Sequence, residues 1–160
     1  MSIEKVKVYL APLGIADRIQ EFDVSSATVE LAAAALGVDG ARITKSMGFK
    51  VGDKAIIVAT AGDQKINSAK YKARFGVKAK MLTFDEAHTM IGHDPGGVCP
   101  FALPEDVEVY LDVSMKRFAT VFPAAGSSNS AIELTCDELE RCSSNFAGWV
   151  DVCKPKEEAT

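Results

Sequence analysis

One lysine interrupts an apolar, strand-like segment of the chain, Ile43-Thr44-Lys45-Ser46-Met47. Burying an unpaired ammonium group is costly, so such a lysine needs water or a partner of opposite charge. Because alternate residues of a strand face opposite ways, Lys45 either faces solvent or binds an anion. The residues alone leave both interpretations open.

A loop rich in glycine and proline, Gly-His-Asp-Pro-Gly-Gly-Val-Cys-Pro-Phe over residues 92–101, could carry chemistry through its backbone. Gly96 and Gly97 permit close approach of a ligand and positive φ, while Pro95 and Pro100 stiffen the entry and the exit. Exposed amide N–H groups in such a turn can hold a carbonyl oxygen and the oxyanion that it becomes. The alternative is a tight turn without a ligand.

Two further groups are candidates for a site. Cys99, near His93, is the thiol to test as a nucleophile, although a small buried residue that packs the loop is the simpler interpretation. The segment Ala-Ala-Gly-Ser-Ser-Asn-Ser at 124–130 offers hydroxyls and an amide that could recognise polar groups. By itself this segment is only a turn.

Several known catalytic devices are absent from the sequence. It has no GxSxG, HExxH, GxxxxGK[ST] or GxGxxG pattern. Its four cysteines form no CxxC pair, and only two histidines accompany them, so no metal site and no cofactor are predicted. Reduced thiols are expected rather than a structural disulfide.

The charge of the chain is strongly uneven. Its net charge is −4, yet the window from Lys45 to Lys80 holds nine basic and two acidic residues, a net +7 that leaves −11 elsewhere. Such a run is either a solvated face or the docking surface for a polyanion, because phosphate attraction is local in salt. The helix with Lys70, Lys72 and Arg74 is the candidate contact with such a polyanion.

Length and composition predict one globular domain over residues 1–160, since 160 residues with 48% hydrophobic and 25% charged side chains can bury one core. No stretch approaches the about 18 apolar residues of a membrane span, and the N-terminus lacks an apolar leader. We therefore expect a cytoplasmic protein without a membrane contact. Its oligomeric state is left open.

Capping residues and glycine stops predict the helices. The first expected helix covers residues 2–11 before Gly14. A second runs from Val29 to Leu36, with Ser25, Ser26 and Thr28 as possible caps and Gly37 as its stop, and a third reaches Phe75 from a cap at Asn67 or Ser68, with Gly76 as its stop. Two more are expected at 84–91 behind the pair Thr83 and Glu86 and, late in the chain, behind Thr135 and Glu138. The pairs Thr83/Glu86 and Thr135/Glu138 have capping-box spacing.

Apolar runs and turn residues predict the strands. The expected strands are a hairpin over 41–51 and 55–62 with a turn at Gly52-Asp53, then 78–82, 107–113, 119–122, 131–134 and 148–152, with 154–160 as a frayed polar tail. Strands separated by single helices, without strict alternation, predict an α+β domain with a mixed sheet.

In this order and spacing, the motifs resemble the YbaK/prolyl-tRNA-synthetase-associated editing family over residues 20–140. The matching residues are Thr28, Ala32, Ala33, Leu36 to Val38, Ile43, Lys45, Ser46, Gly62, Asp63, Ile66, Asn67, Lys70, Gly92, Gly96 to Val98, Pro100, Phe101, Tyr110 to Asp112 and Ala124 to Gly126. Each match is weak singly, and together they make a strong signal.

The resemblance implies a mixed-sheet, barrel-like α+β domain with surrounding helices that removes wrong amino acids from tRNA, here as a free-standing protein. It implies that Lys45 is the family's key lysine, that Gly96 to Pro100 form its GxxxP loop, and that Lys45, Gly96 and Gly97 are catalytic. The expected substrate-binding residues are Thr44, Ser46, His93, Val98, Cys99, Pro100, Gly126, Ser127, Ser128 and Asn129.

The expected partner is the acceptor end of aminoacyl-tRNA, with prolyl-tRNA synthetase or other translation factors as further candidates. Two other functions stay open beside the deacylase: a tRNA-binding or regulatory module without turnover, and a hydrolase that depends on Cys99. The edited amino acid, and whether water or a substrate group attacks, are not predicted.

Overall fold

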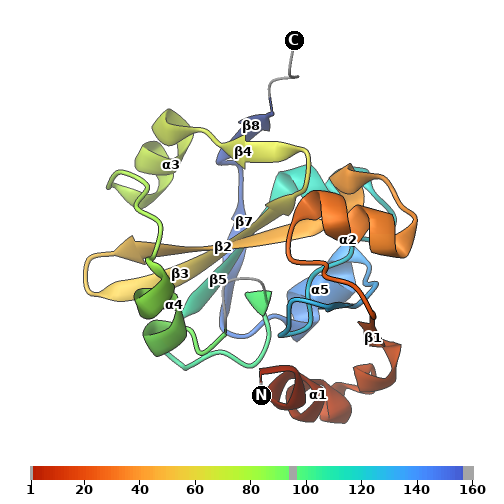
Figure 1. Ribbon diagram of the computed structural model, residues 1–160. Helices are drawn as coiled ribbons and strands as arrows, with labels where there is room; N and C mark the ends of the chain where they lie inside the picture. Colours follow the sequence, from red (N-terminus) through yellow and green to blue (C-terminus); the bar gives the residue numbers. More distant parts are fainter. Residues whose placement is uncertain (1, 94–96, 157–160) are drawn as a thin grey trace.

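The structure is a computed structural model that describes residues 2–93 and 97–156 (Figure 1). The helices of this part are α1 (Ser2–Leu10), α2 (Val29–Leu36), α3 (Ser68–Phe75), α4 (Phe84–Met90) and α5 (Cys136–Cys142). Its strands are β1 (Gln20–Glu21), β2 (Thr44–Val51), β3 (Lys54–Ala61), β4 (Gln64–Ile66), β5 (Glu108–Asp112), β6 (Ser130–Ala131), β7 (Phe146–Val150) and β8 (Cys153–Pro155).

The central sheet is mixed and has the strand order β2-β3-β5-β7. The β2–β3 pair is an antiparallel hairpin, whereas β3–β5 and β5–β7 are parallel pairs. Two small antiparallel pairs, β1–β6 and β4–β8, lie beside it. The predicted α+β fold with a mixed sheet is confirmed, and over the described ranges the strands do not close into a barrel.

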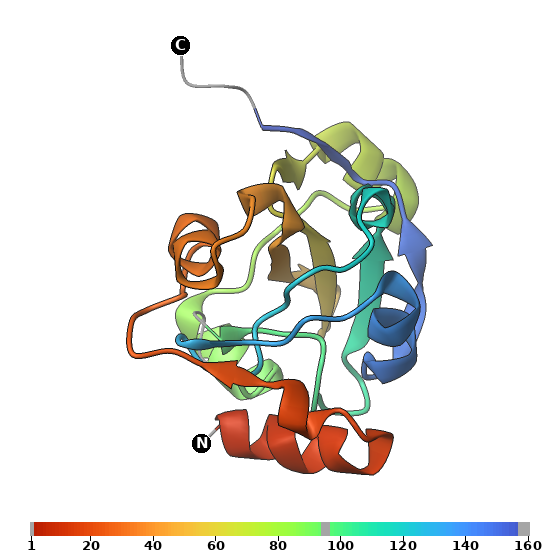
Figure 2. The same ribbon diagram turned by 90° about the vertical axis from the view of Figure 1, so that its right-hand side faces the viewer.

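The sheet is covered on both faces because its central strands are apolar on both faces. On one face, Ile57 and Leu111 pack with Leu10 of α1 and Leu139 of α5. On the other face, the core is made by Val58, Tyr110, Tyr71 of α3, and Val152 and Cys153 near the end of the chain. Both views place α1 at the end of the molecule opposite α3 and β8 (Figures 1 and 2).

The predicted helix boundaries are confirmed by their caps. Thr28 accepts a hydrogen bond from the backbone of α2, and Asn67 caps α3 in the same way. The expected capping boxes are both formed, by Thr83 with Glu86 at α4 and by Thr135 with Glu138 at α5. These side chains satisfy amide groups that the first helical turn leaves without a partner.

Several predicted strands are wrong or shorter than expected. Residues 78–82 form only an isolated bridge between Met81 and Phe49, because this short connection touches the edge strand β2 and then enters α4. Residues 119–122 likewise form isolated bridges, and within 131–134 only the start belongs to a strand, β6.

The end of the described chain is more ordered than expected. Cys153–Pro155 is strand β8, which pairs with the unpredicted β4, and the Lys156 amide donates to the Asp63 carbonyl at 2.9 Å. The expectation of a frayed tail from residue 154 is therefore wrong up to Lys156. None of the helices in the described ranges has the length and apolar character that crossing a membrane requires.

Candidate functional site

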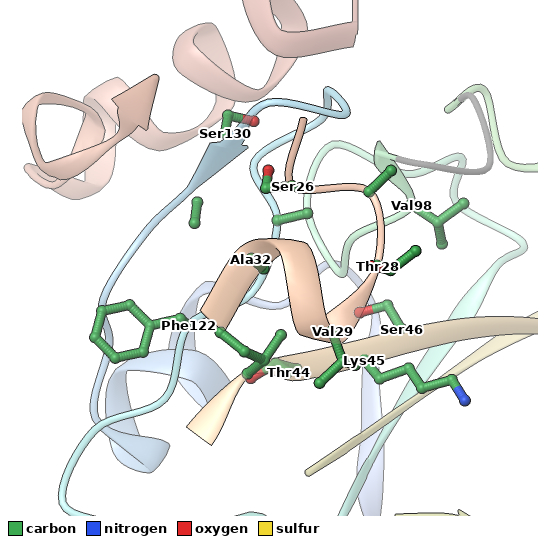
Figure 3. Close-up of a pocket in the computed structure, with 14 residues that line it drawn as sticks. Ser26, Thr28, Val29, Ala32, Thr44, Lys45, Ser46, Val98, Phe122 and Ser130 are labelled. Atoms are coloured by element: carbon green, nitrogen blue, oxygen red, sulfur yellow. The ribbon is translucent and has the colours of Figure 1, made fainter. Parts of the chain in front are cut away.

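A small cavity lies where the start of β2 meets the N-terminal turn of α2 (Figure 3). Its volume is about 80 Å³. The α2 region supplies Ser26, Ala27, Thr28, Val29 and Ala32 to its walls. The β2 region supplies Ile43, Thr44, Lys45 and Ser46. Later segments of the chain supply Val98, Phe122, Ala124, Ser130 and Ala131.

Hydrogen bonds fix the approach to α2 that forms one wall. The Ser26 amide donates to the Ser128 carbonyl at 2.7 Å, and the Ser26 hydroxyl donates to the same carbonyl at 3.3 Å. Two residues later Thr28 caps the helix by accepting from the Leu31 amide at 3.1 Å. The wall is thus held at the loop and at the helix start.

Lys45 combines partial burial with the lack of a counter-ion. Its side chain is half-buried and lines the cavity, and in Figure 3 its ammonium group extends away from α2. Among the residues that the structure describes, none forms an ion pair or hydrogen bond with the Lys45 ammonium group. Burial, and to a smaller extent the charge of Lys156, lowers the pKa of Lys45. A desolvated cation of this kind favours an anionic or strongly polar ligand.

Ser46, the next residue of β2, presents a second group that needs a partner. Its side chain turns toward Thr28 in Figure 3, opposite to Lys45, as strand alternation requires. The Ser46 hydroxyl oxygen is buried and has no hydrogen-bond partner within the described part of the chain. A bound polar group would satisfy it. By contrast, the buried Thr44 hydroxyl lies 3.6 Å from the Met115 sulfur and belongs to the core.

Two glycine-containing loops meet beside the cavity. A Cβ atom at Gly97 would lie 2.7 Å from both the carbonyl carbon of Gly126 and the amide nitrogen of Ser127. Gly126 itself has a φ of 97°. Only glycine allows this close approach of two backbones, so the structure brings together two segments that the sequence singles out separately. Gly96 lies outside the described residues.

The other residues of the glycine-proline loop differ in position. Val98 lines the cavity, whereas the buried Pro100 accepts a hydrogen bond from the Ser144 amide through its carbonyl. His93 and Cys99 are fully buried, and His93 Nε2 lies 2.8 Å from the Phe101 carbonyl oxygen. Burial raises the pKa of the Cys99 thiol to about 12, which disfavours the thiolate that a nucleophile requires. Neither His93 nor Cys99 lines the cavity.

Ser127, Ser128 and Asn129 also lie outside the cavity lining. The Ser127 hydroxyl donates to Asn129 Oδ1 at 3.0 Å, and the Asn129 side chain donates to the Phe22 carbonyl at 3.0 Å. This loop therefore ties the segment before α2 in place, and its last residue, Ser130, reaches the cavity instead.

The basic residues of α3 are exposed, and two of them already contact other groups of the protein. Lys70 Nζ donates to Asp151 and to the Cys153 carbonyl, each at 3.2 Å. The Arg74 guanidinium lies over the rings of Phe75 and Tyr110, 5.2 and 5.3 Å from their centroids. Lys72 is exposed on the same helix. Lys72 is therefore more available than its two neighbours to contact an anion such as an RNA phosphate.

Sequence reasoning missed much of the cavity wall. Thr28 was expected as a helix cap and as part of the family motif, and Ser130 as part of the polar segment 124–130, but neither was placed at this cavity. Ser26 and Phe122 were not expected at a site, because their contribution depends on the tertiary contact between distant segments. Across the described ranges, no group of three His, Cys, Asp or Glu side chains could hold a metal ion. All four cysteines are free thiols.

Known proteins resemble this chain in sequence and fold. Residues 23–142 match the aminoacyl-tRNA editing domain. The uncharacterized protein YwhH of Bacillus subtilis (strain 168) is 50% identical over 155 residues, which cover 96% of this chain and 98% of YwhH. Proline–tRNA ligase of the same strain is 33% identical over 103 residues, 64% of this chain but 18% of the ligase.

A solved structure described as a "putative trans-editing enzyme for prolyl tRNA synthetase" has the same fold. Its TM-score is 0.85 at 24% identity, with 97% of that chain and 96% of this one covered. The family match spans α2, β2, both glycine-containing loops and α5, so it includes every segment that lines the cavity. The chain belongs to the aminoacyl-tRNA editing domain family.

Proposed function

We propose that this protein is a trans-acting aminoacyl-tRNA deacylase, which hydrolyses the ester between a wrongly attached amino acid and the terminal ribose of tRNA. The observation that carries the proposal is the cavity of about 80 Å³ at which Lys45, Ser46 and the Gly97 loop meet. A cavity of this size suits a small amino-acid side chain. The match of YwhH over nearly its whole length favours a protein that acts without an attached synthetase.

The reaction needs little chemical assistance because the substrate is an activated ester. Water, which gives up a proton to a group of the substrate as it attacks, adds to the ester carbonyl carbon and forms a tetrahedral oxyanion. Collapse of this intermediate breaks the bond to the ribose oxygen, which takes up a proton. The products are the free amino acid and a tRNA with a free terminal hydroxyl.

Each residue of the site has a role that follows from its chemistry. Backbone amides of Gly96 and Gly97 would stabilise the oxyanion, an assignment that rests for Gly96 on the sequence motif. Lys45 would hold the terminal nucleotide or its phosphate and so fix the ester in place. Ser46 would donate or accept a hydrogen bond with the bound aminoacyl ester. No carboxylate or imidazole belongs to the described cavity lining, which favours assistance by the substrate itself.

The proposed partner is the acceptor end of a mischarged tRNA, and the proposed place of action is the cytoplasm. The ligase relatives suggest a mischarged proline tRNA as the substrate and prolyl-tRNA synthetase as a further partner. Lys72 would contribute to the surface that attracts the RNA.

A panel of tRNAs, each charged with a wrong amino acid, tests the proposal. Release of free amino acid from at least one of them should depend on Lys45, with Lys45→Ala folded and inactive and Lys54→Ala, in the exposed hairpin turn, active. Binding of tRNA without any release would instead identify a non-catalytic tRNA-binding module. Turnover that survives Lys45→Ala but fails on thiol alkylation would identify the hydrolase that depends on Cys99.

A further inference from the structure

A second cavity adjoins the first one on the opposite side of Ser46 and Val98. It is an apolar groove of about 320 Å³ between the edge strand β2 and helix α4. Ser46 and Val98 line both cavities, so a ligand that spans them must pass these two residues. The volume of the groove falls in the range of about 300 to 1,000 Å³ in which proteins bind small organic ligands.

The floor of the groove depends on a glycine in β2, Gly48. A Cβ atom at Gly48 would lie 2.8 Å from the terminal methyl groups of both Ile91 and Leu82. Because Gly48 has no side chain, these two residues close over the strand and form a smooth apolar base. The groove therefore offers a flat surface with few polar groups.

The rim of the groove exposes two large apolar side chains. Phe84 is 65% exposed and Met81 is 59% exposed. Phe84 is the first residue of α4, and the capping box of Thr83 and Glu86 fixes that turn. Glu86 is also paired with Lys50 of β2 at 3.2 Å. The helical turn that carries Phe84 is thus fixed, and its exposed ring is available for a flat group to stack on.

The charge next to this rim suits a phosphate backbone. Lys78 and Lys80 are both exposed and come directly before Met81. From Lys72 to Lys80 the chain has no acidic residue. A strand of nucleic acid that places a base in the groove could therefore place its preceding phosphates near these lysines.

We propose that the groove binds the terminal adenine base of the acylated tRNA, with one face of the base against Phe84 and Met81. The aminoacyl group would then enter the cavity of about 80 Å³, and the ester would lie between the two at Ser46 and Val98. This inference rests on the proposed deacylase function. Its basis is a match in size: the substrate has one small part and one larger, flat part, and the two cavities that share Ser46 and Val98 differ in volume in the same way. Bases stack on aromatic side chains because each has a π face.

The test measures binding and turnover separately. Calorimetry gives the Kd of the RNA trinucleotides CCA and CCU, and steady-state hydrolysis gives kcat and KM for the best aminoacyl-tRNA. The variants are Phe84→Ala, Met81→Ala and the ring-preserving Phe84→Tyr. Val8→Ala is the control, because Val8 is 73% exposed on α1 and does not line the groove.

The wild type should bind CCA more tightly than CCU. Phe84→Ala should raise the Kd for CCA and the KM about tenfold, equivalent to about 1.4 kcal/mol, with kcat nearly unchanged. Phe84→Tyr should restore both constants, Met81→Ala should weaken CCA binding in the same direction, and Val8→Ala should match the wild type. Melting temperatures of the variants verify that they are folded.

Three results would overturn the adenine site. The first is a wild-type protein that does not distinguish CCA from CCU. The second is a Phe84→Ala variant with unchanged Kd and KM. The third is a changed amino-acid preference in Phe84→Ala, because that result would place the aminoacyl group in the groove. A wild type that binds CCA through Phe84 but releases no amino acid would contradict the deacylase function and leave the nucleotide site intact.

Discussion

Gly97 and Gly126 lie so close together that a Cβ atom at Gly97 would stand 2.7 Å from the Gly126 carbonyl carbon. Backbone atoms cannot rotate away as side-chain ends can, so Gly97→Ala must push the two loops apart. We expect this variant to lose hydrolysis by about a hundredfold, the effect of misplacing a reacting group by about 1 Å. Steady-state kinetics on the best aminoacyl-tRNA measures the loss.

Gly14→Ala is the control for the accompanying loss of stability. Gly14 has a φ of 79° and no atom within contact distance of a Cβ, and it lies after α1. A non-glycine residue there costs about 1 to 2 kcal/mol of backbone strain without touching the site. Gly14→Ala should therefore melt earlier but keep its turnover. Equal turnover in both alanine variants would remove the Gly97 contact from the mechanism.

Lys45 is expected to lower stability while it supports catalysis. Burial lowers the pKa of Lys45 below its ordinary value of 10.5, so the folded protein disfavours the charged form. The resulting penalty is fully present at neutral pH, where the residue is charged in both states, and it diminishes as pH rises through the folded-state pKa. Lys45→Met, which keeps the length of the side chain, should be inactive yet melt no lower than the wild type.

The pH dependence of melting tests this assignment. Any advantage of Lys45→Met at pH 7 should shrink as the pH approaches 10.5, since the wild-type lysine then loses its charge in the folded state. Lys54→Met, in the exposed hairpin turn, should show neither effect. A Lys45→Met protein that is clearly less stable at pH 7 would mean that the ammonium group has a stabilising partner.

The tyrosines Tyr71 and Tyr9 form a matched pair for stability. The Tyr71 hydroxyl is buried without a hydrogen-bond partner among the described residues, whereas the Tyr9 hydroxyl donates to the Cys142 carbonyl at 2.7 Å. Removing an unsatisfied polar group costs little, so Tyr71→Phe should leave the free energy of unfolding unchanged or raise it. Tyr9→Phe should lower it by about 1 kcal/mol. Chemical denaturation measures both, and equal losses would indicate that Tyr71 has a partner after all.

Cys99 is expected to be structural. It is fully buried and its pKa is raised to about 12 by that burial, so iodoacetamide should not modify it in the folded protein. Cys136, which is partly exposed, should react first. Cys99→Ala should keep its activity at a cost of about 1 kcal/mol in stability. A folded but inactive Cys99→Ala protein, or labelling of Cys99 before Cys136, would revive the nucleophile hypothesis.

Local structure could be predicted from the sequence because few neighbouring residues decide it. Thr83 with Glu86, Thr135 with Glu138, and the Gly52 turn each act within one helical turn or hairpin, and each was found as expected. Strands β4 and β8 have only three residues each and exist because they pair with each other. A pairing between segments almost 90 residues apart leaves no periodic pattern in either one.

The candidate site was predictable to the extent that it lies on such local elements. Lys45 and the two glycine loops were singled out by residue type, Ser46 and Val98 by the family resemblance, and these residues come together in the structure. Ser127 to Asn129 were expected at the substrate; they lie outside the cavity lining, and their hydrogen bonds to the segment before α2 could not be predicted from the sequence. Strand alternation fixes that Lys45 and Ser46 point oppositely, but their common place in the cavity wall depends on where α2 packs.

Lys72 provides the test of whether the basic window guides tRNA. It is exposed on α3, while its neighbours Lys70 and Arg74 are engaged with Asp151 and with aromatic rings. Lys72→Glu should therefore weaken RNA attraction without breaking an internal contact. The turnover of limiting aminoacyl-tRNA should fall with added salt. The variant should reduce the slope of the log-log plot by about 0.7 to 0.9 for each phosphate that the protein no longer neutralises.

The control and a second substrate separate docking from chemistry. Lys5→Glu reverses an exposed charge on α1, at the opposite end of the molecule, and should leave the slope unchanged. A minimal aminoacyl-adenosine ester has no phosphates to contact, so Lys72→Glu should hydrolyse it as fast as the wild type does. Turnover independent of salt, or an equal loss on both substrates, would show that α3 is a solvated face and that the two cavities beside Ser46 act without an RNA-docking surface.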